Sequence, residues 1–308
     1  MINLIKIGTR SSKLALYQAN LVRENLKKRF PNIDYSIVEI KTKGDKIQDR
    51  NLDRSIDKGF FVKEIQDSLI EEKIDIAVHS LKDLPVENSS IIKTSAILER
   101  GNHKDVFLSR SKKKLSEFTK NEIIGTSSLR RKAQLLNINP NLTVKDIRGN
   151  VDTRIKKMIN GEYDGLVMAA AGIERLGLEG YISEYLDVEI MLNAPGQGAI
   201  AIEINSDKSE IDEIICKINH EETERCTFLE RSFMDKLGGG CNSPIAAFSS
   251  VNGDKICLIG AVLSLDGKVL IKDKAEANKN ENVDLDNLLA NKILENGGKE
   301  LIKKFDFE

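Results

Sequence analysis

The sequence lacks an excess of charge of either sign, since 47 lysine and arginine residues nearly cancel 48 aspartate and glutamate residues in 308 positions. This balance excludes a general attraction to nucleic acid or an anionic membrane, so any anion site must be a local cluster. No apolar run reaches 18 residues, which excludes a transmembrane helix. The opening MINLIKIGTR also lacks the apolar core of a secretion signal, so we expect a cytoplasmic location.

Paired cysteines and clustered histidines are missing as well. The four cysteines, Cys216, Cys226, Cys241 and Cys257, form no CxxC pair, and the three histidines are scattered. We therefore expect free thiols in a reducing compartment and no metal site. The phosphate-binding patterns GxxxxGK[ST] and GxGxxG are absent too, which makes a nucleotide a weaker candidate ligand.

What the chain does contain is typical of a soluble globular protein of two or three domains, with 40% hydrophobic and 31% charged residues. Apolar runs at Leu4–Gly8, Tyr35–Lys41 and Ile74–Ser80 predict strands. Helical periodicity predicts helices at Lys13–Phe30 and Phe61–Glu72. This β-α-β-α-β order indicates an α/β lobe.

A second unit of the same kind follows. We expect its strands at Ile123–Ile124, Val144–Ile147 and Gly165–Ala169, and its helices at the KAQLL segment and at Val151–Asn160. A further strand-like run, Gly198–Ile204, could return to the sheet of the first lobe. The sequence therefore predicts two α/β lobes with mixed sheets.

The pattern changes again after about Glu221. The elements that we expect there are a helix at Thr223–Lys236, strands at Ala246–Ser250, Lys255–Ser264 and Lys268–Ala275, and a last helix at Leu285–Leu294. This predicts a small α+β C-terminal domain with an antiparallel sheet. The expected domains are 1–99 with 198–218, then 104–193, then 221–308, with hinges near Glu99–Lys104 and Asn193–Gln197.

Hydroxyls and cations follow four of the predicted strands. In open α/β sheets, ligands bind beyond the carboxyl ends of the strands, and the planar arginine side chain matches a carboxylate or a phosphate. Repetition in two lobes predicts a cleft for a polyanion, although any one serine or threonine could simply cap a helix. The candidates are Arg10, Ser12, Ser80, Lys82, Thr126, Ser128, Arg130, Arg131, Arg148, Asn150 and Arg154.

Asp83 is an acid among these cations, in HSLKDLP. Nearby positive charge would keep it ionised, and a carboxylate in a cationic cleft can stabilise positive charge that develops on a substrate. A helix cap or a salt-bridge partner is the alternative for this residue.

Cys241 lies in a glycine-rich stretch, LGGGCNSPI. The glycines allow another body to approach the backbone closely. The thiol could be a nucleophile or an attachment point, and because no histidine lies near it in sequence, covalent attachment stays open. A small buried hydrophobic residue is the alternative.

Seven segments occur in an order that resembles the hydroxymethylbilane synthases, also called porphobilinogen deaminases. They are IGTRSSKLALYQA, KGFFVKE, DIAVHSLKDLP, GTSSLRR, RGNVDTR, APGQGA and GGGCNSPI, and they span nearly the whole chain. The resemblance implies a transferase that joins four porphobilinogen molecules head to tail and releases ammonia at each step. Its product is the linear tetrapyrrole hydroxymethylbilane, in haem and porphyrin biosynthesis.

The resemblance also implies a fold, a cofactor and roles for single residues. The expected fold has two lobes like those of periplasmic binding proteins, and the third domain carries a dipyrromethane joined to Cys241 through a thioether. Asp83 is the implied catalytic residue. The implied cofactor-binding residues are Asp83, Ser12, Ser80, Lys82, Thr126, Ser128, Arg130, Arg131, Arg148 and Asn150. The implied substrate-binding residues are Arg10, Arg148, Arg154, Arg175, Lys58 and Gln197. The expected partners are porphobilinogen and the growing oligopyrrole, with no nucleic acid or membrane, and the family suggests a monomer.

The chain departs from the family pattern before KGFFVKE. The family often has GGKG where this chain has IDKG, at Ile56–Gly59, and a lysine is common where Arg54 stands. Lys58 could still act over the active site. A non-catalytic two-lobed binding protein for a small carboxylated ligand is the competing hypothesis. The missing secretion signal and Cys241 with its domain speak against it.

Overall fold

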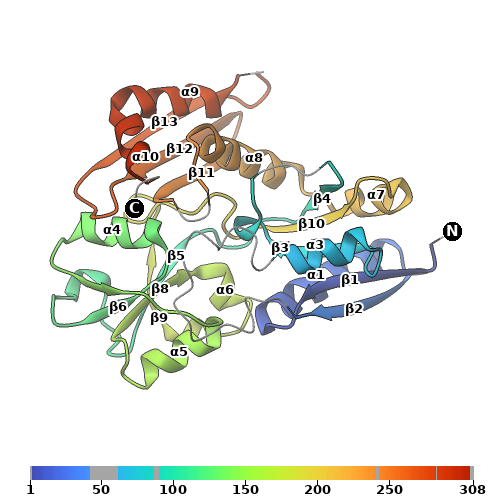
Figure 1. The fold of residues 1–308 in the computed structure, drawn as a ribbon, viewed down its shortest axis with the longest axis horizontal. Helices are drawn as coiled ribbons and strands as arrows, with labels where there is room; N and C mark the ends of the chain where they lie inside the picture. Colours follow the sequence, from blue (N-terminus) through green and yellow to red (C-terminus); the bar gives the residue numbers. More distant parts are fainter. Residues whose placement is uncertain (1, 42–61, 87–89, 241–242, 282, 306–308) are drawn as a thin grey trace. The chain divides into compact units, whose positions relative to one another are not determined.

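A computed structural model describes residues 2–41, 62–86, 90–240, 243–281 and 283–305 (Figure 1). The chain forms two compact units, Met1–Gly101 with Gly198–Glu224, and Asn102–Gln197 with Arg225–Glu308. Each unit is described by itself. Within the described ranges, no helix combines the length and the apolar character needed to cross a membrane.

The first unit is built on a five-stranded sheet. Its strands are β1 (Leu4–Arg10), β2 (Asp34–Ile40), β3 (Ile76–Ser80), β4 (Ile92–Ile97) and β10 (Ile200–Asn205), in the order β2-β1-β3-β10-β4. β1 runs parallel to β2 and β3, whereas β10 is antiparallel to β3 and β4. The chain therefore returns to the first sheet after it has built the second, as the sequence predicted for Gly198–Ile204.

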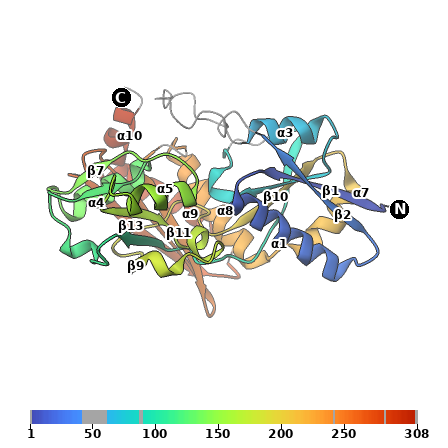
Figure 2. The same ribbon diagram turned by 90° about the horizontal axis from the view of Figure 1, so that it is seen from below.

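Helices cover both faces of this sheet. The helical elements are α1 (Lys13–Arg29), α3 (Lys63–Ile70), α7 (Ser209–Ile215) and the 3₁₀ turns Leu81–Asp83 and Cys216–Ile218. Side chains of α1 and α7 pack with Ile76 and Val78 of β3, and those of α3 pack with Ala77. Neighbouring strand residues point to opposite faces, so α1 and α3 lie on opposite sides of the sheet (Figure 2).

The second unit contains a sheet of the same design. Its strands are β5 (Asp105–Ser109), β6 (Ile123–Gly125), β7 (Thr143–Lys145), β8 (Gly165–Ala169) and β9 (Ile182–Leu186), in the order β7-β6-β8-β5-β9. β6 is parallel to β7 and β8, and β5 is antiparallel to β8 and β9. Its helical elements are α4 (Leu129–Ile138), α5 (Val151–Ile159), α6 (Ala170–Glu174) and the turns Leu115–Glu117 and Glu179–Tyr181.

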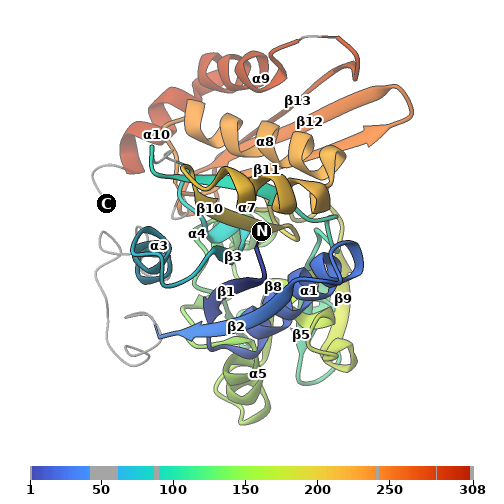
Figure 3. The same cartoon turned by 90° about the vertical axis from the view of Figure 1, so that its right-hand side faces the viewer.

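A three-stranded antiparallel sheet completes the second unit (Figure 3). It consists of β11 (Ile245–Asn252), β12 (Lys255–Leu263) and β13 (Leu270–Asn278), with α8 (Glu221–Lys236), α9 (Leu285–Ile293), a π turn (Leu294–Gly298) and α10 (Lys299–Phe305). The Phe233 ring of α8 lies so close to Gly260 of β12 that a Cβ atom there would come within 2.3 Å of it. The other face packs against residues of 102–197, including Ala133 and Leu192.

The predicted fold class is confirmed: two α/β lobes with mixed sheets are followed by a small antiparallel sheet with helices. The division into 1–99 with 198–218, 104–193 and 221–308 stays a prediction. The compact units differ from it, because 225–308 belongs to the same unit as 102–197 and the start of α8, up to Glu224, belongs to the first unit.

Candidate functional site

In the first unit, the predicted residues gather where β1 and β3 end. These strands are parallel neighbours, so Arg10 and Ser80 lie at the same edge of the sheet. Ser12 caps α1, and its Oγ accepts a hydrogen bond from the backbone N–H of Ala15 at 3.3 Å. The Gln18 side chain of α1 donates to Ser80 Oγ at 2.8 Å and so joins the helix to the end of β3.

Asp83 follows directly after this edge. Ser80 ends β3, and a single 3₁₀ turn, Leu81–Asp83, brings the chain around. Leu81 is buried and anchors the turn, whereas Lys82 is half-buried and Asp83 is exposed. An acid and a cation therefore stand side by side on a short, anchored turn, where both can meet a ligand.

His79 of β3 belongs to a buried polar cluster with Glu203 and Gln66. His79 Nε2 lies 3.3 Å from Glu203 Oε2, and both side chains are almost fully buried. The Gln66 amide of α3 donates to both oxygens of Glu203 at 3.1 Å. These contacts connect α3, β3 and β10 next to Ser80 and limit how far the end of β3 can shift.

In the second unit, the segment GTSSLRR turns from β6 into α4 through its own hydroxyls. Thr126 is buried, and its Oγ1 accepts from the backbone N–H of Ser128 at 3.3 Å. Ser128 caps α4 by accepting from the N–H of Arg131 at 3.4 Å. Ser127 Oγ donates to the carbonyl of Ile147 and accepts from its N–H at 3.2 Å, which ties this turn to the one before RGNVDTR.

Arg130 and Arg131 converge on a carboxylate that the sequence analysis did not single out, Asp105 at the start of β5. Arg130 Nη1 donates to Asp105 Oδ2 at 2.7 Å, and Arg131 donates to Oδ1 from Nε at 3.0 Å and from Nη2 at 2.7 Å. All three side chains are buried. The arginines were predicted to bind carboxylates of a ligand, but in this structure they bind a carboxylate of the chain itself.

The electrostatics of this cluster favour the ionised acid. Burial raises the pKa of Asp105, but the attraction and hydrogen bonds of Arg130 and Arg131 outweigh it and hold that pKa well below its usual range. Burial also lowers the pKa of Arg130, which Asp105 opposes. Gln197, predicted to bind substrate, is fully buried here, where its Nε2 donates to Asp105 Oδ1 at 3.0 Å and to the His103 carbonyl at 2.8 Å.

The segment RGNVDTR begins α5. Gly149 has a φ of +116°, a conformation that suits glycine, and a Cβ there would come within 2.7 Å of Thr153. Asn150 is the N-terminal cap residue, but its side chain makes no capping hydrogen bond. Arg154 Nε donates to the Gly149 carbonyl at 2.7 Å. Arg148 is half-buried beside this turn, so the segment presents cations at a helix N-terminus.

Three predicted residues remain. Arg175 is half-buried and ends α6. Cys241 and Lys58 lie outside the described residues. Next to Cys241 in the chain, Gly240 N–H donates to Ser243 Oγ at 2.9 Å, and Ser243 N–H donates to the Gly240 carbonyl at 3.0 Å. These hydrogen bonds join Gly240 directly to Ser243.

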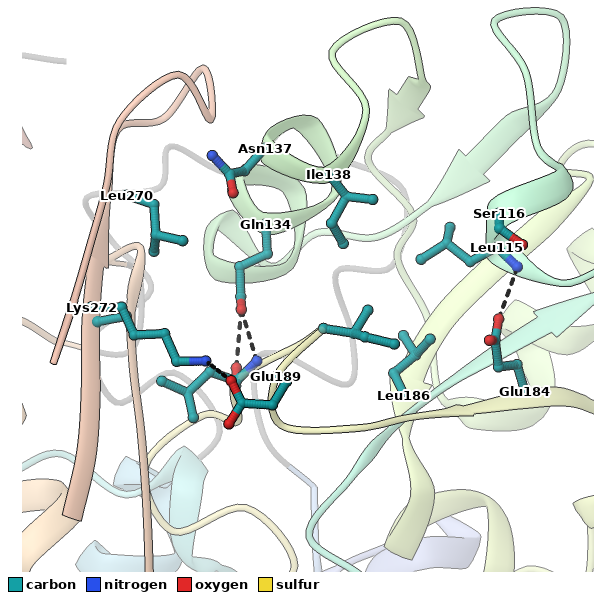
Figure 4. Close-up of a pocket in the computed structure, with 13 residues that line it drawn as sticks. Leu115, Ser116, Gln134, Asn137, Ile138, Glu184, Leu186, Glu189, Leu270 and Lys272 are labelled. Carbon is teal, nitrogen blue, oxygen red and sulfur yellow. Dashed lines mark hydrogen bonds and ion pairs between the residues drawn. The ribbon is translucent and has the colours of Figure 1, made fainter. Parts of the chain in front are cut away.

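A cavity of about 380 Å³ lies elsewhere in the second unit (Figure 4). None of the predicted site residues lines it. Gln134 of α4 hydrogen-bonds at its edge to both backbone groups of Leu192, and Lys272 of β13 pairs with Glu189 at 2.8 Å. The side chains of Gln134, Glu189 and Lys272 thus already have partners within the chain.

The comparisons with known proteins decide the family. The sequence profile of "Porphobilinogen deaminase, dipyromethane cofactor binding domain" matches residues 5–213, and that of "Porphobilinogen deaminase, C-terminal domain" matches 223–295. The porphobilinogen deaminase of Alkaliphilus metalliredigens is 43% identical over 299 residues, which cover 97% of this chain and 95% of that protein. The chain belongs to the porphobilinogen deaminase family.

A second relative in this family, the porphobilinogen deaminase of Thermus thermophilus, is 42% identical over 97% of this chain and 98% of its own length. The profile over 5–213 is named for the dipyrromethane cofactor, so the cofactor predicted from the sequence is that of the family. Among solved structures, the methionine-binding protein MetQ is 12% identical over 70% of this chain and 89% of its own, with a TM-score of 0.46. The family assignment rests on the sequence relatives alone.

Proposed function

We propose that this chain is a hydroxymethylbilane synthase, a transferase that joins four porphobilinogen molecules head to tail, releases ammonia at each step and then releases the linear product. The observation that carries this proposal is identity of 43% to a porphobilinogen deaminase along 97% of the chain, together with the match to the cofactor-binding domain. The polar turns at the strand ends of both units support it, because substrate and product carry an acetate and a propionate on every pyrrole.

The residues present fit a dipyrromethane, whose carboxylates need several donors. α1, α4 and α5 each offer an N-terminus, and Ser12 and Ser128 stand at two of them. Asn150 stands at the third, the N-terminus of α5. Its side-chain amide makes no capping hydrogen bond and could donate to a ligand. We propose that these three residues, with Ser80, Lys82, Thr126, Arg130, Arg131 and Arg148, hold the cofactor, and that Cys241 anchors it through a thioether. When bound, the group would supply the free α-carbon to which the first porphobilinogen is joined, and each later one adds to the end of the growing chain.

Asp83 is the proposed catalytic residue. Loss of ammonia leaves positive charge on the substrate, and a carboxylate placed beside it lowers the energy of that state. The exposed position of Asp83, on a turn anchored by buried Leu81, supports this role because the carboxylate is accessible and yet fixed in place. Lys82 on the same turn offers a cation for a carboxylate of the same ligand.

Substrate binding is assigned to a second set of cations. We propose that five cations bind the carboxylates of porphobilinogen and of the growing chain: Arg10, Arg148, Arg154, Arg175 and Lys58. Each charge-assisted hydrogen bond of this kind contributes about 1.5–3 kcal/mol. Gln197 acts through the Asp105 cluster, because its side chain is buried there. A monomeric state and a cytoplasmic location stay predictions.

Intact-protein mass spectrometry tests the proposal. The purified protein should exceed the mass of its sequence by two porphobilinogen units less the ammonia lost, and Cys241→Ser should lose both this increment and activity. Cys216→Ser is the matched control, because Cys216 is an exposed free thiol, and it should keep the increment. Full activity in a protein of unmodified mass would contradict covalent priming.

A further inference from the structure

The Arg130–Arg131 pair is organised by one acid from a neighbouring strand. Asp105 begins β5, whereas the arginines lie in the first turn of α4. Consecutive residues of a helix point about 100° apart, so two adjacent arginines reach one carboxylate only if each side chain bends toward it. Asp105 accepts from both through different oxygens, and this fixes both guanidinium planes at once.

The two arginines differ in what else they bind. Arg131 donates from all three nitrogens within the unit, to Asp105 and, from Nη1 at 3.1 Å, to the Val167 carbonyl. Arg130 donates from Nη1 to Asp105 and to the Leu192 carbonyl at 2.6 Å. Its Nε is buried and has no hydrogen-bond partner among the residues that the structure describes. The Nε–H of Arg130 is therefore an unused hydrogen-bond donor within the described part of the chain. Arg131 is held in place through all three of its nitrogens.

The charge of the cluster suits an anionic ligand. Two guanidinium groups and one carboxylate leave a single positive charge at the N-terminus of α4, where the helix adds partial positive charge of its own. Without the acid, two buried cations would repel each other across a short distance. Asp105 therefore determines both the orientation of the two guanidinium groups and the net charge of the cluster.

We propose that Asp105 is a positioning residue for cofactor loading, which holds Arg130 and Arg131 in the arrangement that receives carboxylates of the dipyrromethane. This inference rests on the proposed function. It means that cofactor loading depends on the orientation of the two arginine side chains and not only on their presence.

The experiment measures loading directly, by mass, in the wild type and in Asp105→Asn, Asp105→Glu and Asp286→Asn. Asp286 is the matched control, because it is another buried acid, paired with Lys236 at 3.0 Å, but lies on α9. Each protein is purified, and its unloaded fraction is incubated with porphobilinogen over a range of concentrations, well below its own unfolding temperature.

We expect Asp105→Asn to be purified mostly unloaded and to need roughly 10- to 100-fold more porphobilinogen for half-maximal loading, the effect of one charge-assisted hydrogen bond lost. Asp105→Glu keeps the charge but adds a methylene, so it should fall between this variant and the wild type. Asp286→Asn should unfold at a lower temperature and still load as the wild type does, because its arginines are unchanged.

Wild-type loading of Asp105→Asn, once it is kept well below its unfolding temperature, would overturn the inference and leave the acid a structural role. If Asp105→Asn does not fold, Asp105→Glu decides, and loading identical to the wild type would again overturn it. A wild-type protein that carries no added mass and gains none from porphobilinogen would instead refute the proposed function.

Discussion

Asp105 is a buried charge, and buried ion pairs in general add little net stability. Two guanidinium groups and a carboxylate lose their hydration together, and their attraction only offsets that cost when every group finds a partner. Here Asp105 accepts from both arginines and from Gln197. Removing one member of such a cluster typically costs about 3–5 kcal/mol, whereas an apolar replacement of the whole is often neutral. The cluster therefore specifies an arrangement, which is what a binding site needs.

Asp83 is the opposite case, an acid that the fold does not need. It is exposed, and the buried anchor of its turn is Leu81. We expect Asp83→Asn to fold and unfold like the wild type and to carry the cofactor mass, with kcat reduced roughly 100-fold or more, because the amide cannot stabilise positive charge.

Steady-state kinetics with porphobilinogen, alongside thermal unfolding and intact mass, check this expectation. Asp67→Asn on the exposed side of α3 is a control for the loss of one carboxylate. A kcat close to that of the wild type in Asp83→Asn would remove this residue from the mechanism.

At the scale of elements, the polar turns were predicted correctly from their position after predicted strands. Three strands were not predicted, because their hydrophobic residues show no clear periodic pattern. The β5 segment DVFLS is buried at all five positions and shows no alternation. β4 and β9 were missed too, each a short strand of five or six residues. Strand β6 was predicted because the polar segment GTSSLRR and a helical pattern follow it directly in sequence.

The same limit explains which residues of the site could not be predicted from the sequence. Ser12, Ser80 and Ser128 follow predicted strands, so their place at a sheet edge could be inferred from local sequence. Asp105 is distant from Arg130 in sequence and meets it only through the pairing of β5 with β8. An acid at the start of a strand does not by itself indicate an arginine partner. Gln197 was predicted only because it belongs to the family motif APGQGA.

Ser12 belongs to the element scale, because its side chain caps α1 and is also proposed to bind the cofactor. Ser12→Ala should lower the free energy of unfolding by about 1 kcal/mol through loss of the cap. Ser12→Asp should restore stability, since aspartate is a good cap and favours the helix N-terminus. It should nevertheless reduce cofactor loading, because its charge repels a carboxylate.

Urea unfolding and intact mass separate these two roles. The alanine variant loses the hydroxyl without adding a charge, and it should load better than the aspartate variant despite its lower stability. Equal loading of Ser12→Asp and the wild type would show that Ser12 is a cap and nothing more.

The whole molecule combines segments that are far apart in sequence. β10 lies between β3 and β4, so the first sheet is completed only after the chain has passed through 102–197. The family match extends across both units, from residue 5 to residue 295 with a short gap. We therefore expect function to require both units, although each has its own core.

The grouping of 225–308 with 102–197 gives the last expectation. Ala261 of β12 is almost fully buried in a cluster with Ala133 and Leu192, so Ala261→Asp would place an unpaired charge where these parts of the second unit meet. We expect it to destabilise that unit by about 3 kcal/mol. Hydrogen exchange should then accelerate both in strands β5 to β9 and in strands β11 to β13, while β1, β3, β4 and β10 of the first unit stay protected.

Ala77→Asp is the matched control, because Ala77 is equally buried in β3 of the first unit and should produce the reverse pattern. The contrast follows from cooperativity, since a unit with shared cores opens as a whole. If Ala261→Asp exposes only β11, β12 and β13 while 102–197 keeps its protection, the C-terminal sheet opens as an independent domain. The three-domain division predicted from the sequence would then describe the stability of this protein better than its two compact units do.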